Sequence, residues 1–488
     1  QARVDLQRDF RGFILRVGAA FNRQERDRQA GSVTYNFQPN GSAAAADRLA
    51  GKFDVFDQAY NASTFTFYGE PGNWLSVAKA YDLFRQQPNW WVENAATSHV
   101  NRVNASTLLR EDIAAAYLRA DFNLLANRLR VVTGVRYEET ATEGWGPLND
   151  PTARYLRDAA GNIVRNAAGQ PVFRSSDALV RAQQQYQERG AHASRRYDGL
   201  YPSLNGTYRF SDELLLRVGY ARTIGRPNLN FIIPGVTVPD SEAPSPRTFQ
   251  VVNTGLRPWR ASNYDLSLES YQFKGGFGSI GVFQKDITDF FNVVTTELTP
   301  DLVEQYGIPA SEVDPGDLVS TRTNGGNARI RGLELMYRQR LQFLPWAFGR
   351  SLQVFVNYNK LHLGGNRESD FGSFTPSNWA WGLSLIRPRW SVKFNESYQG
   401  EIRRTLVAVS AANGIPANTY NYQGERRRLS LSAEYGLSRR FSLFGSWADI
   451  GGLDSYSRRY APDTPEYARV SNFAELGSTL TVGIKGDF

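Results

Sequence analysis

The last stretch of the chain reads Ser478-Thr479-Leu480-Thr481-Val482-Gly483-Ile484-Lys485-Gly486-Asp487-Phe488. Alternate residues of a strand fall on opposite faces, so this stretch has one apolar face and one polar face. The apolar face comprises Leu480, Val482, Ile484, Gly486 and Phe488. The sequence also stops on an aromatic residue, and an apolar aromatic end suits a lipid boundary better than water. The stretch therefore predicts the closing strand of a transmembrane β-barrel.

The composition excludes several other classes of protein. The 488 residues include a single Met, Met336, and no Cys, so the chain has neither a disulfide framework nor a Cys-ligated metal. No apolar run approaches the roughly 18 residues that a membrane helix needs. Barrel strands expose only every second residue to lipid, so a weak hydropathy signal remains compatible with a barrel.

The charged residues and histidines give no sign of a reactive centre. The net charge is +8, but the 56 Lys and Arg are spread along the chain beside 48 Asp and Glu, so we expect a solvated surface and no nucleic-acid partner. His99, His192 and His362 stand apart, without a motif that would join them to a nucleophile or a metal. We therefore expect no catalytic residue, no metal site and no cofactor, and we predict that the chain is not an enzyme.

Alternating segments recur along the whole chain, in pairs joined by short polar turns that carry the Gly, Pro, Asp and Ser that tight turns need. The pairs are residues 3–8 with 13–21, 113–122 with 129–138, 203–210 with 214–223, 264–273 with 279–287, 330–341 with 352–358, 379–386 with 390–398, and 429–435 with 441–447. With the terminal strand they make about fifteen strands. The prediction is an all-β, antiparallel transmembrane barrel.

The two faces of these strands differ in polarity. Leu214, Leu216 and Val218 share one side of their strand, whereas Arg217 lies on the other. A sandwich core would not tolerate so many inward polar groups, but the lumen of a barrel would. We expect a lumen wall that includes Arg136, Arg217, Glu334 and Arg338; a merely solvated surface is the alternative role for these four residues.

Aromatic residues gather at both ends of the strands, as the two interfacial girdles of an outer-membrane barrel do. The short-turn end carries Phe10, Phe122, Phe210, Phe273, Trp390, Phe441 and Phe488, and the far end carries Phe21, Tyr137, Tyr220, Tyr264, Tyr358, Trp379 and Trp447. The alternative is the ordinary enrichment of aromatic residues in strands.

Long connections separate the strand pairs, roughly at residues 22–112, 139–200, 224–263, 288–329, 361–378, 399–428 and 448–477. Short periplasmic turns and long extracellular loops are typical of outer-membrane barrels. Trp90, Trp91, Trp145 and Trp259 lie in these connections and could stack on a sugar or an aromatic chelator. Packing within the loops is the alternative role for these side chains.

The second half of the chain contains three motifs, at residues 220–227, at residues 253–259 with 263–266, and at residues 324–335. They resemble motifs of TonB-dependent outer-membrane receptors. Tyr220-Ala-Arg-Thr-Ile-Gly-Arg-Pro227 resembles their "Y-x-R-T-x-x-R-P" stretch. Residues 253–259 and 263–266 are similar to their "N-P-x-L-K-P … N-Y-E-L" segment, and residues 324–335 to their strand "N-x-G-x-A-x-x-x-G-x-E-L". The terminal strand resembles their C-terminal assembly signal, which gives that role to Phe488. The matches cover most of residues 201–488 in the family's order.

The resemblance implies a barrel of twenty-two strands, of which this sequence supplies about fifteen. We therefore expect residues 1–488 to be the C-terminal part of a receptor barrel without a plug domain. TonB would then act only through a plug region outside this sequence. A further expectation is that the terminal strand is well formed while the seam opposite it is open. The other implied partners are outer-membrane lipid and the barrel assembly machinery, in a bacterial outer membrane that the chain crosses many times.

The resemblance implies TonB-energised uptake of a scarce ligand, such as a siderophore, cobalamin or an oligosaccharide. A passive outer-membrane porin is the main alternative, because porins share the alternation, the girdles and the terminal aromatic residue. An outer-membrane protease or lipase would need a Ser/His or Asp/His constellation, for which the sequence shows no motif. A soluble all-β binding module could show the same alternation in each strand.

Overall fold

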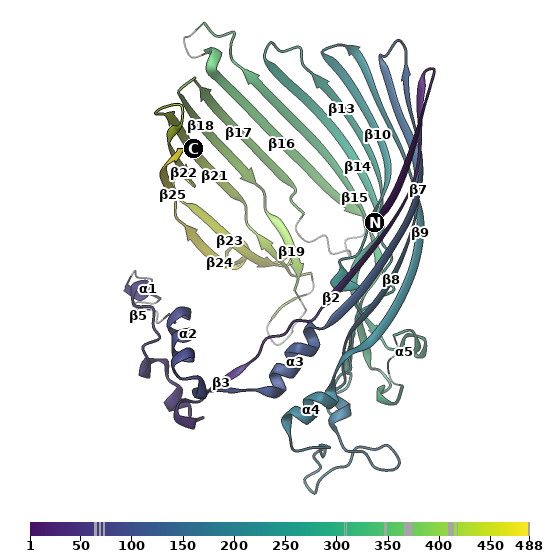
Figure 1. The fold of residues 1–488 in the computed structure, drawn as a ribbon, viewed down its shortest axis with the longest axis vertical. Helices are drawn as coiled ribbons and strands as arrows, with labels where there is room; N and C mark the ends of the chain where they lie inside the picture. The colour runs from purple at the N-terminus through teal and green to yellow at the C-terminus, as the bar shows by residue number, and fades with distance from the viewer. Residues whose placement is uncertain are drawn as a thin grey trace.

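The computed structural model describes residues 1–62, 66–67, 70–71, 74–306, 308, 310–345, 349–365, 374–407, 414–416 and 418–486. A sheet of seventeen strands dominates the structure. Fifteen of these strands pair in chain order, each antiparallel to the next, and Figure 1 shows the resulting sheet curving around an interior. The residue predicted as the assembly signal, Phe488, lies outside the described residues, so its role stays a prediction.

All fifteen strands predicted from the alternation are present. They are β1 (Ala2–Phe10), β2 (Phe13–Arg28), β7 (Thr107–Leu124), β8 (Leu129–Asn149), β9 (Tyr186–Ser211), β10 (Leu214–Gly225), β13 (Trp259–Ser270), β14 (Gly276–Glu297), β15 (Leu318–Arg340), β16 (Leu352–Gly365), β17 (Ser377–Ile386), β18 (Trp390–Gln399), β21 (Arg426–Gly436), β22 (Phe441–Ala448) and β25 (Thr479–Gly486). One boundary was wrong, because β13 ends at Ser270 and leaves Phe273 in the turn.

The terminal strand is well formed, and the sheet has two free edges. Strand β25 pairs with β22 over its whole length, from Thr479 opposite Ala448 to Gly486 opposite Phe441. At the other edge, β1 pairs with β2. Neither strand has a second neighbour among the described residues, so the seam between them is open, as predicted (Figure 1).

The outward face of the sheet is apolar between two rows of aromatic residues. Leu266, Val282 and Val218 are 44%, 47% and 51% exposed, as side chains are when no protein covers them. At the long-loop end of the strands, Tyr220 lies directly opposite Tyr264. In the same row Tyr358 faces Trp379, which stacks on Tyr398 at 5.5 Å between ring centroids. Each of these groups of rings spans neighbouring strands, as the rings of a membrane girdle do.

Several inward aromatic rings lie across glycines of the neighbouring strand. Phe355 of β16 lies opposite Gly382 of β17, where an added Cβ would come within 2.5 Å of the ring. Phe283 lies opposite Gly332 in the same way, with a distance of 2.3 Å. The glycine supplies the space, and the ring covers a backbone that no side chain would otherwise protect. This pairing explains why Phe355 faces a mostly polar interior.

The strands continue well beyond the long-loop row of aromatic residues, into segments expected to be loops. Strand β8 runs on to Asn149 and β9 begins at Tyr186, while β14 ends at Glu297 and β15 begins at Leu318. The extensions carry polar residues on both faces, so the alternation on which the sequence analysis relied is lost there. Sheet pairing alone reveals them.

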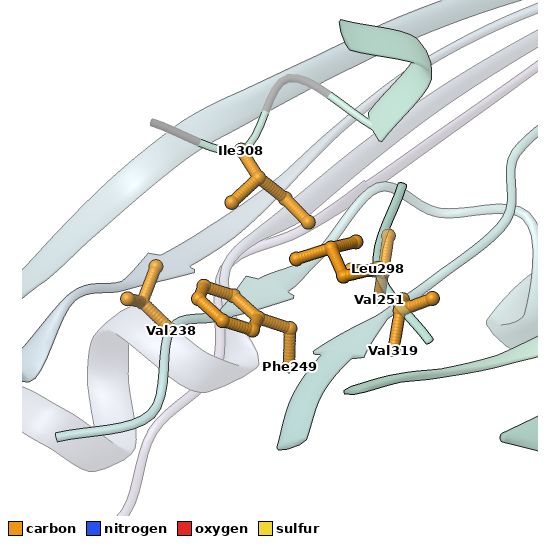
Figure 2. Packing of buried hydrophobic residues seen from close by; sticks show 6 residues of the cluster. All are labelled: Val238, Phe249, Val251, Leu298, Ile308 and Val319. Atoms are coloured by element: carbon orange, nitrogen blue, oxygen red, sulfur yellow. The ribbon is translucent and has the colours of Figure 1, made fainter. Parts of the chain in front are cut away.

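Two short strands close the long-loop end between these extensions. Strand β11 (Val236–Thr237) pairs in parallel with β8, and β12 (Thr248–Val251) pairs in parallel with β15. Figure 2 shows the apolar cluster that they help to enclose, whose buried members are Val238, Phe249, Val251, Leu298, Ile308 and Val319. Phe249 and Val319 are fully buried. We call this unit, formed by residues 226–258 and 298–317 with the start of β15, the cap.

A buried ion pair joins the two segments of the cap. The guanidinium of Arg247 donates to Asp317 at 2.6 Å, and the backbone N–H of Arg247 donates to the same carboxylate at 3.0 Å. The side chains are 4% and 0% exposed. Burial works to raise the pKa of Asp317, but the hydrogen bonds from Arg247 and the backbone N–H of Asp314 outweigh it, so the pKa lies below its ordinary value.

The remaining elements lie at the long-loop end. A second sheet contains β19 (Ile402–Leu406), β20 (Tyr420–Gln423), β23 (Leu453–Tyr460) and β24 (Val470–Leu476), and two small sheets pair β3 (Tyr35–Phe37) with β6 (Trp91–Glu93) and β4 (Thr66–Phe67) with β5 (Glu70–Pro71). The helices are α1 (Gln58–Ala62), α2 (Val77–Gln86), α3 (Ala95–Ala105), α4 (Ala178–Gln185) and α5 (Pro300–Tyr306). Among the residues described, none of the helices has the length and apolar character needed to cross a membrane.

The buried ion pair predicts an acid-sensitive cap. Asp317→Asn leaves Arg247 charged without its partner, which costs about 3 kcal/mol in a buried site. Because the folded pKa of Asp317 is depressed, the stabilisation is present above the unfolded value of 3.8 and is lost as pH falls through the folded value. The protection factors of the β12 amides, which correct for the intrinsic pH dependence of exchange, should therefore fall in the variant at neutral pH, and in the unmodified chain in acid.

The matched control is Asp314→Asn. Asp314 also contacts Arg247, at 3.0 Å, but its side chain is 67% exposed, so its loss should cost less than about 1 kcal/mol. An equal fall of the protection factors in the two variants would contradict the assignment of Asp317 as the anchor.

The glycines beneath inward rings predict a site-dependent cost of adding one methyl group. Gly382→Ala would place a Cβ 2.5 Å from Phe355 and 2.6 Å from the carbonyl oxygen of Phe394, so we expect a loss of about 1–3 kcal/mol. At Gly219 the nearest atom to an added Cβ is 3.5 Å away, and Gly219→Ala should be nearly neutral. Denaturant midpoints of the purified chain in detergent measure both, and equal midpoints would refute the packing role.

Candidate ligand-binding site

A cavity of about 650 Å³ lies at the long-loop end, between the extension of β14 and the second sheet. It brings together segments more than a hundred residues apart. Its lining comprises Asn292, Val293, Val294, Arg403, Leu406, Asn418, Tyr420, Tyr422, Tyr460 and Pro462. We call it the tyrosine cavity, because three of these residues are tyrosines.

Strand pairing places the three tyrosines together. Tyr420 of β20 lies directly opposite Tyr460 of β23, and Tyr422 is the diagonal neighbour of Tyr460. The rings of Tyr422 and Tyr460 stack with their centroids 3.9 Å apart and their planes 7° from parallel. The pair therefore forms a rigid aromatic wall rather than two independent side chains.

Charged groups hold this wall from behind. The hydroxyl of Tyr460 donates to Glu401 at 2.7 Å, and the guanidinium of Arg458 donates to the other oxygen of Glu401 at 2.8 Å. The guanidinium of Arg403 lies 4.7 Å from the ring centre of Tyr420, and that of Arg469 lies 4.8 Å from the ring centre of Tyr460. Stacked rings with adjacent cations can hold a planar or sugar-like ligand that carries oxygen atoms or negative charge.

The phenols of the wall stay neutral at physiological pH. Burial raises the pKa of Tyr422, and the neighbouring Tyr460 and Arg403 offset only part of that rise. Burial also raises the pKa of Tyr460, and the hydrogen bond to the Glu401 carboxylate raises it further. Because the Tyr460 hydroxyl already donates to Glu401, the wall offers a ligand mainly the faces of two neutral rings.

The tryptophans predicted to bind a ligand lie elsewhere, in three different places. Trp90 packs on Phe53, with ring centroids 5.7 Å apart, and Trp91 packs on Phe37 at 4.8 Å and on Phe84 at 5.7 Å. These contacts form an aromatic cluster within the connection between β2 and β7. Packing occupies both rings, and a binding role for them stays a prediction.

Trp145 lies on the outer face of the β8 extension. The flanking Gly144 and Gly146 face Pro234 of the cap, so Trp145 between them points to the opposite side. Its ring stacks on His192 at 4.8 Å, and the guanidinium of Arg110 lies 5.3 Å from the ring centre.

Trp259 begins β13 and packs at the base of the cap. Its ring lies across Gly225, and it contacts the apolar cluster that contains Leu256 and Ile232. The structure therefore does not bring Trp145 or Trp259 together with the other two tryptophans, and their binding role also stays a prediction.

The four residues predicted for the lumen wall fall into two kinds. Arg136 donates to Glu138 of the same strand at 2.7 Å, and Arg217 donates to Glu269 of the neighbouring strand at 2.7 Å, so both are held in ion pairs. Glu334 and Arg338 are exposed on the inward side of β15, and neither has an ion-pair partner within the described ranges. Contact of these four with a plug stays a prediction.

The arginine of the Arg226-Pro227 motif has a structural role that the sequence alone did not reveal. Its guanidinium reaches across β9 to Glu138 of β8, whose side chain is only 9% exposed. Arg226 is the first residue after β10, so this ion pair ties the start of the cap to the wall. The sequence marks Arg226 only through its motif, and the motif does not indicate that Glu138 is its partner.

The sequence analysis did not single out the tyrosine cavity. Tyr420-Asn-Tyr422 and Tyr456-Ser-Arg-Arg-Tyr460 are alternating segments, but the pairing of β20 with β23 joins two different connections. In the described part of the chain, no group of three or more His, Asp or Glu side chains is placed to hold a metal ion.

Comparison with known proteins adds the family. The family model for TonB dependent receptor-like β-barrels matches residues 1–485. A comparison with curated proteins finds no match. The structure resembles the copper transporter OprC, with a TM-score of 0.52 and 12% identity over 100% of this chain and 56% of the other.

Two receptors of named bacteria show the same likeness. The ferric-catecholate import receptor Fiu of E. coli K12 in its closed form has a TM-score of 0.54 at 13% identity, over 99% of this chain and 54% of the other. The ferric yersiniabactin uptake receptor FyuA of Yersinia pestis has a TM-score of 0.50 at 12% identity, over 100% and 53%. The chain thus spans about half the length of these solved structures.

The stacked wall predicts an alkaline titration that depends on Glu401. The absorbance difference between the unmodified chain and Tyr460→Phe isolates the ionisation of Tyr460, which we expect well above the ordinary phenol pKa of about 10. In a Glu401→Gln background the same difference should move to lower pH, because the hydrogen bond to a carboxylate that raises the pKa is gone. Coincident curves in the two backgrounds would show that Glu401 does not hold the wall.

Proposed function

The chain belongs to the TonB-dependent receptor β-barrel family, and we propose that it forms the wall and ligand-capturing end of an outer-membrane receptor for TonB-energised uptake. The family match over residues 1–485 carries the proposal. The long-loop end would then face the outside of the cell and the short turns the periplasm, as in other barrels of this membrane. The whole receptor crosses the membrane many times and surrounds a polar lumen.

Capture of the ligand would begin at the tyrosine cavity. Its wall presents the stacked rings of Tyr422 and Tyr460, and Arg403 places a cation at its edge. Such a surface suits a bulky polar ligand with flat or ring-shaped parts, which fits a siderophore, a cobalamin or an oligosaccharide. Trp90, Trp91, Trp145 and Trp259 remain secondary candidates at the same end of the molecule.

Translocation would use the polar inner wall. Glu334 and Arg338 are exposed there, so they can pair with charged groups of a plug, whereas Arg136 and Arg217 already have partners. We propose that TonB acts on that plug rather than on the wall. The wall itself does no covalent chemistry in this scheme, which needs no cofactor. Outer-membrane lipid and the barrel assembly machinery are the other proposed partners, with Phe488 as the assembly signal.

A passive porin is the alternative function. A porin needs an open aqueous lumen, whereas the proposed receptor needs energy and a high-affinity site. Liposomes that contain the purified receptor should therefore not swell in solutions of small sugars. Swelling without an energy source would favour the porin.

The uptake experiment uses cells that carry the complete receptor. Iron(III) bound to a catecholate siderophore, cyanocobalamin and a maltooligosaccharide are tested separately as labelled probes. We expect one of them to accumulate, and accumulation should stop when the proton gradient is collapsed. Tyr422→Ala should weaken adsorption of that probe to cells about tenfold, because the loss of one stacked ring costs about 1.4 kcal/mol.

The control for the tyrosine variant is Tyr467→Ala. Tyr467 lies in the same long-loop region but is 90% exposed and lines no part of the cavity. Equal loss of adsorption in both variants would argue against the cavity as the capture site. Accumulation that persists without the proton gradient would overturn energised uptake.

A further inference from the structure

A second cavity opens beside the outward face of the wall, just beyond the aromatic row at the long-loop end. Leu335 and Leu333 of β15 face outward, and Arg331 and Arg329 follow on the same face because they have the same parity. On the next strand His362 lies opposite Arg331, and Lys360 lies opposite Leu333. These basic residues therefore begin where the apolar band ends.

The cavity has a volume of about 490 Å³, and six of its ten lining residues carry polar or charged side chains. Its outward side chains are Asp286, Thr288, Arg329, Arg331 and His362. The glycines at positions 364 and 365 keep its floor low, because they carry no side chain. A hollow of this size can hold a phosphate group together with part of a sugar or glycerol.

The charge around this cavity is unbalanced. Arg329 pairs with Asp286 at 2.5 Å, which is the one carboxylate in the lining. Arg331 donates to the neutral amide oxygen of Gln284 at 2.9 Å and so keeps its full charge. Lys360, at the edge, has no ion-pair partner within the part of the chain that the structure describes. Among the described residues, two positive charges are thus left without a carboxylate partner on the outward face.

A second set of cations on the outward face differs, because these cations are paired with carboxylates. Arg23 on β2 makes two hydrogen bonds of 2.7 Å with Asp112, and Arg110 donates to Glu25 at 2.8 Å. Arg196 on β9 is paired with Glu139 in the same way.

The heights of the two sets can be compared through the girdle. Arg196 stands four residues from Leu200, which lies opposite the girdle residue Tyr137. Arg331 stands four residues from Leu335, which lies opposite the girdle residue Tyr358. The two sets therefore lie at similar heights, but the set on β15 and β16 lacks matching carboxylates within the described ranges.

We propose that Arg329, Arg331, Lys360 and His362 form a binding site for the phosphate group of an outer-leaflet lipid. Guanidinium groups bind phosphate through paired hydrogen bonds, and Lys360 adds a point charge at the edge. The acyl chains of the same lipid would lie along Leu333 and Leu335, next to Tyr358. Cations at this level attract anionic headgroups. The inference rests on the outer-membrane placement proposed above, but it requires neither transport nor TonB.

The test measures lipid bound to the complete receptor in neutral detergent, by native mass spectrometry. The probe is diphosphorylated lipid A, a glycolipid, compared with its dephosphorylated form and with inorganic phosphate. The variant Arg331→Gln/Lys360→Gln removes the two uncompensated charges and keeps the pair between Arg329 and Asp286. We expect lipid A binding to weaken about thirtyfold in this variant, since each cation near a headgroup contributes about one factor of five.

The matched control is Arg23→Gln/Arg196→Gln, which removes two cations from the same face at a similar height. These cations are already neutralised by Asp112 and Glu139, so binding should change less than twofold. Equal weakening in both variants would show that bulk charge, not a site, attracts the lipid. Equal binding of dephosphorylated lipid A would overturn recognition of the phosphate, and saturation by inorganic phosphate alone would assign the site to a free anion.

The proposal of lipid binding and the proposal of energised uptake can be refuted independently of each other. Lipid binding in detergent involves no ligand of the tyrosine cavity, and energised uptake of a probe by cells does not depend on which lipid sits beside β15. A receptor that transports its ligand but binds lipid A equally well in both variants would overturn only this inference.

Discussion

The register between neighbouring strands is the constraint on which the rest of the structure depends. Because side chains alternate along a strand, a slip by one residue would move every apolar residue of that strand from the lipid side to the polar interior. The rows of directly opposed aromatic residues, such as Tyr220 with Tyr264 and Tyr358 with Trp379, show that the register is kept across successive strands. The inward rings that lie across glycines fix it from the other side, since Phe355 fits only where Gly382 stands opposite.

The membrane part of the fold could be predicted from the sequence because lipid and lumen impose opposite chemistry on successive residues. That contrast is lost beyond the aromatic row, where the cap packs against part of the inner side of the sheet. The extensions of β8, β9, β14 and β15 were therefore taken for loops. Their pairing is long-range: β11 and β12 join β8 to β15 across the cap, and no periodicity in residues 226–258 reveals that connection.

The candidate site, like the fold, could be predicted only in part from the sequence. Aromatic residues in loops are conspicuous in a sequence, which is why the four tryptophans were selected. Trp90 and Trp91 prove to be the interior of a small aromatic cluster, whereas the tyrosines that line a cavity come from two connections that meet only in the second sheet. A large aromatic ring can stabilise either the packing of its own loop or a bound ligand, so ring size alone does not distinguish the two roles. A ring with one face open to a cavity is a better candidate for binding, and this geometry is visible only in the folded chain.

The regions of the molecule differ in whether their charged side chains are paired with opposite charges. Inside the cap, water is excluded and an unpaired ion would be costly, so Arg247 and Asp317 are matched and hydrogen-bonded to the backbone. On the outward wall between β2 and β9, cations and carboxylates also match. The lining between β14 and β16 departs from this rule although carboxylates could have been placed on those strands. Within the described residues the two cations have no carboxylate partner, and their mutual repulsion gains nothing for the fold, which is why an anion of the lipid headgroup layer is the proposed partner.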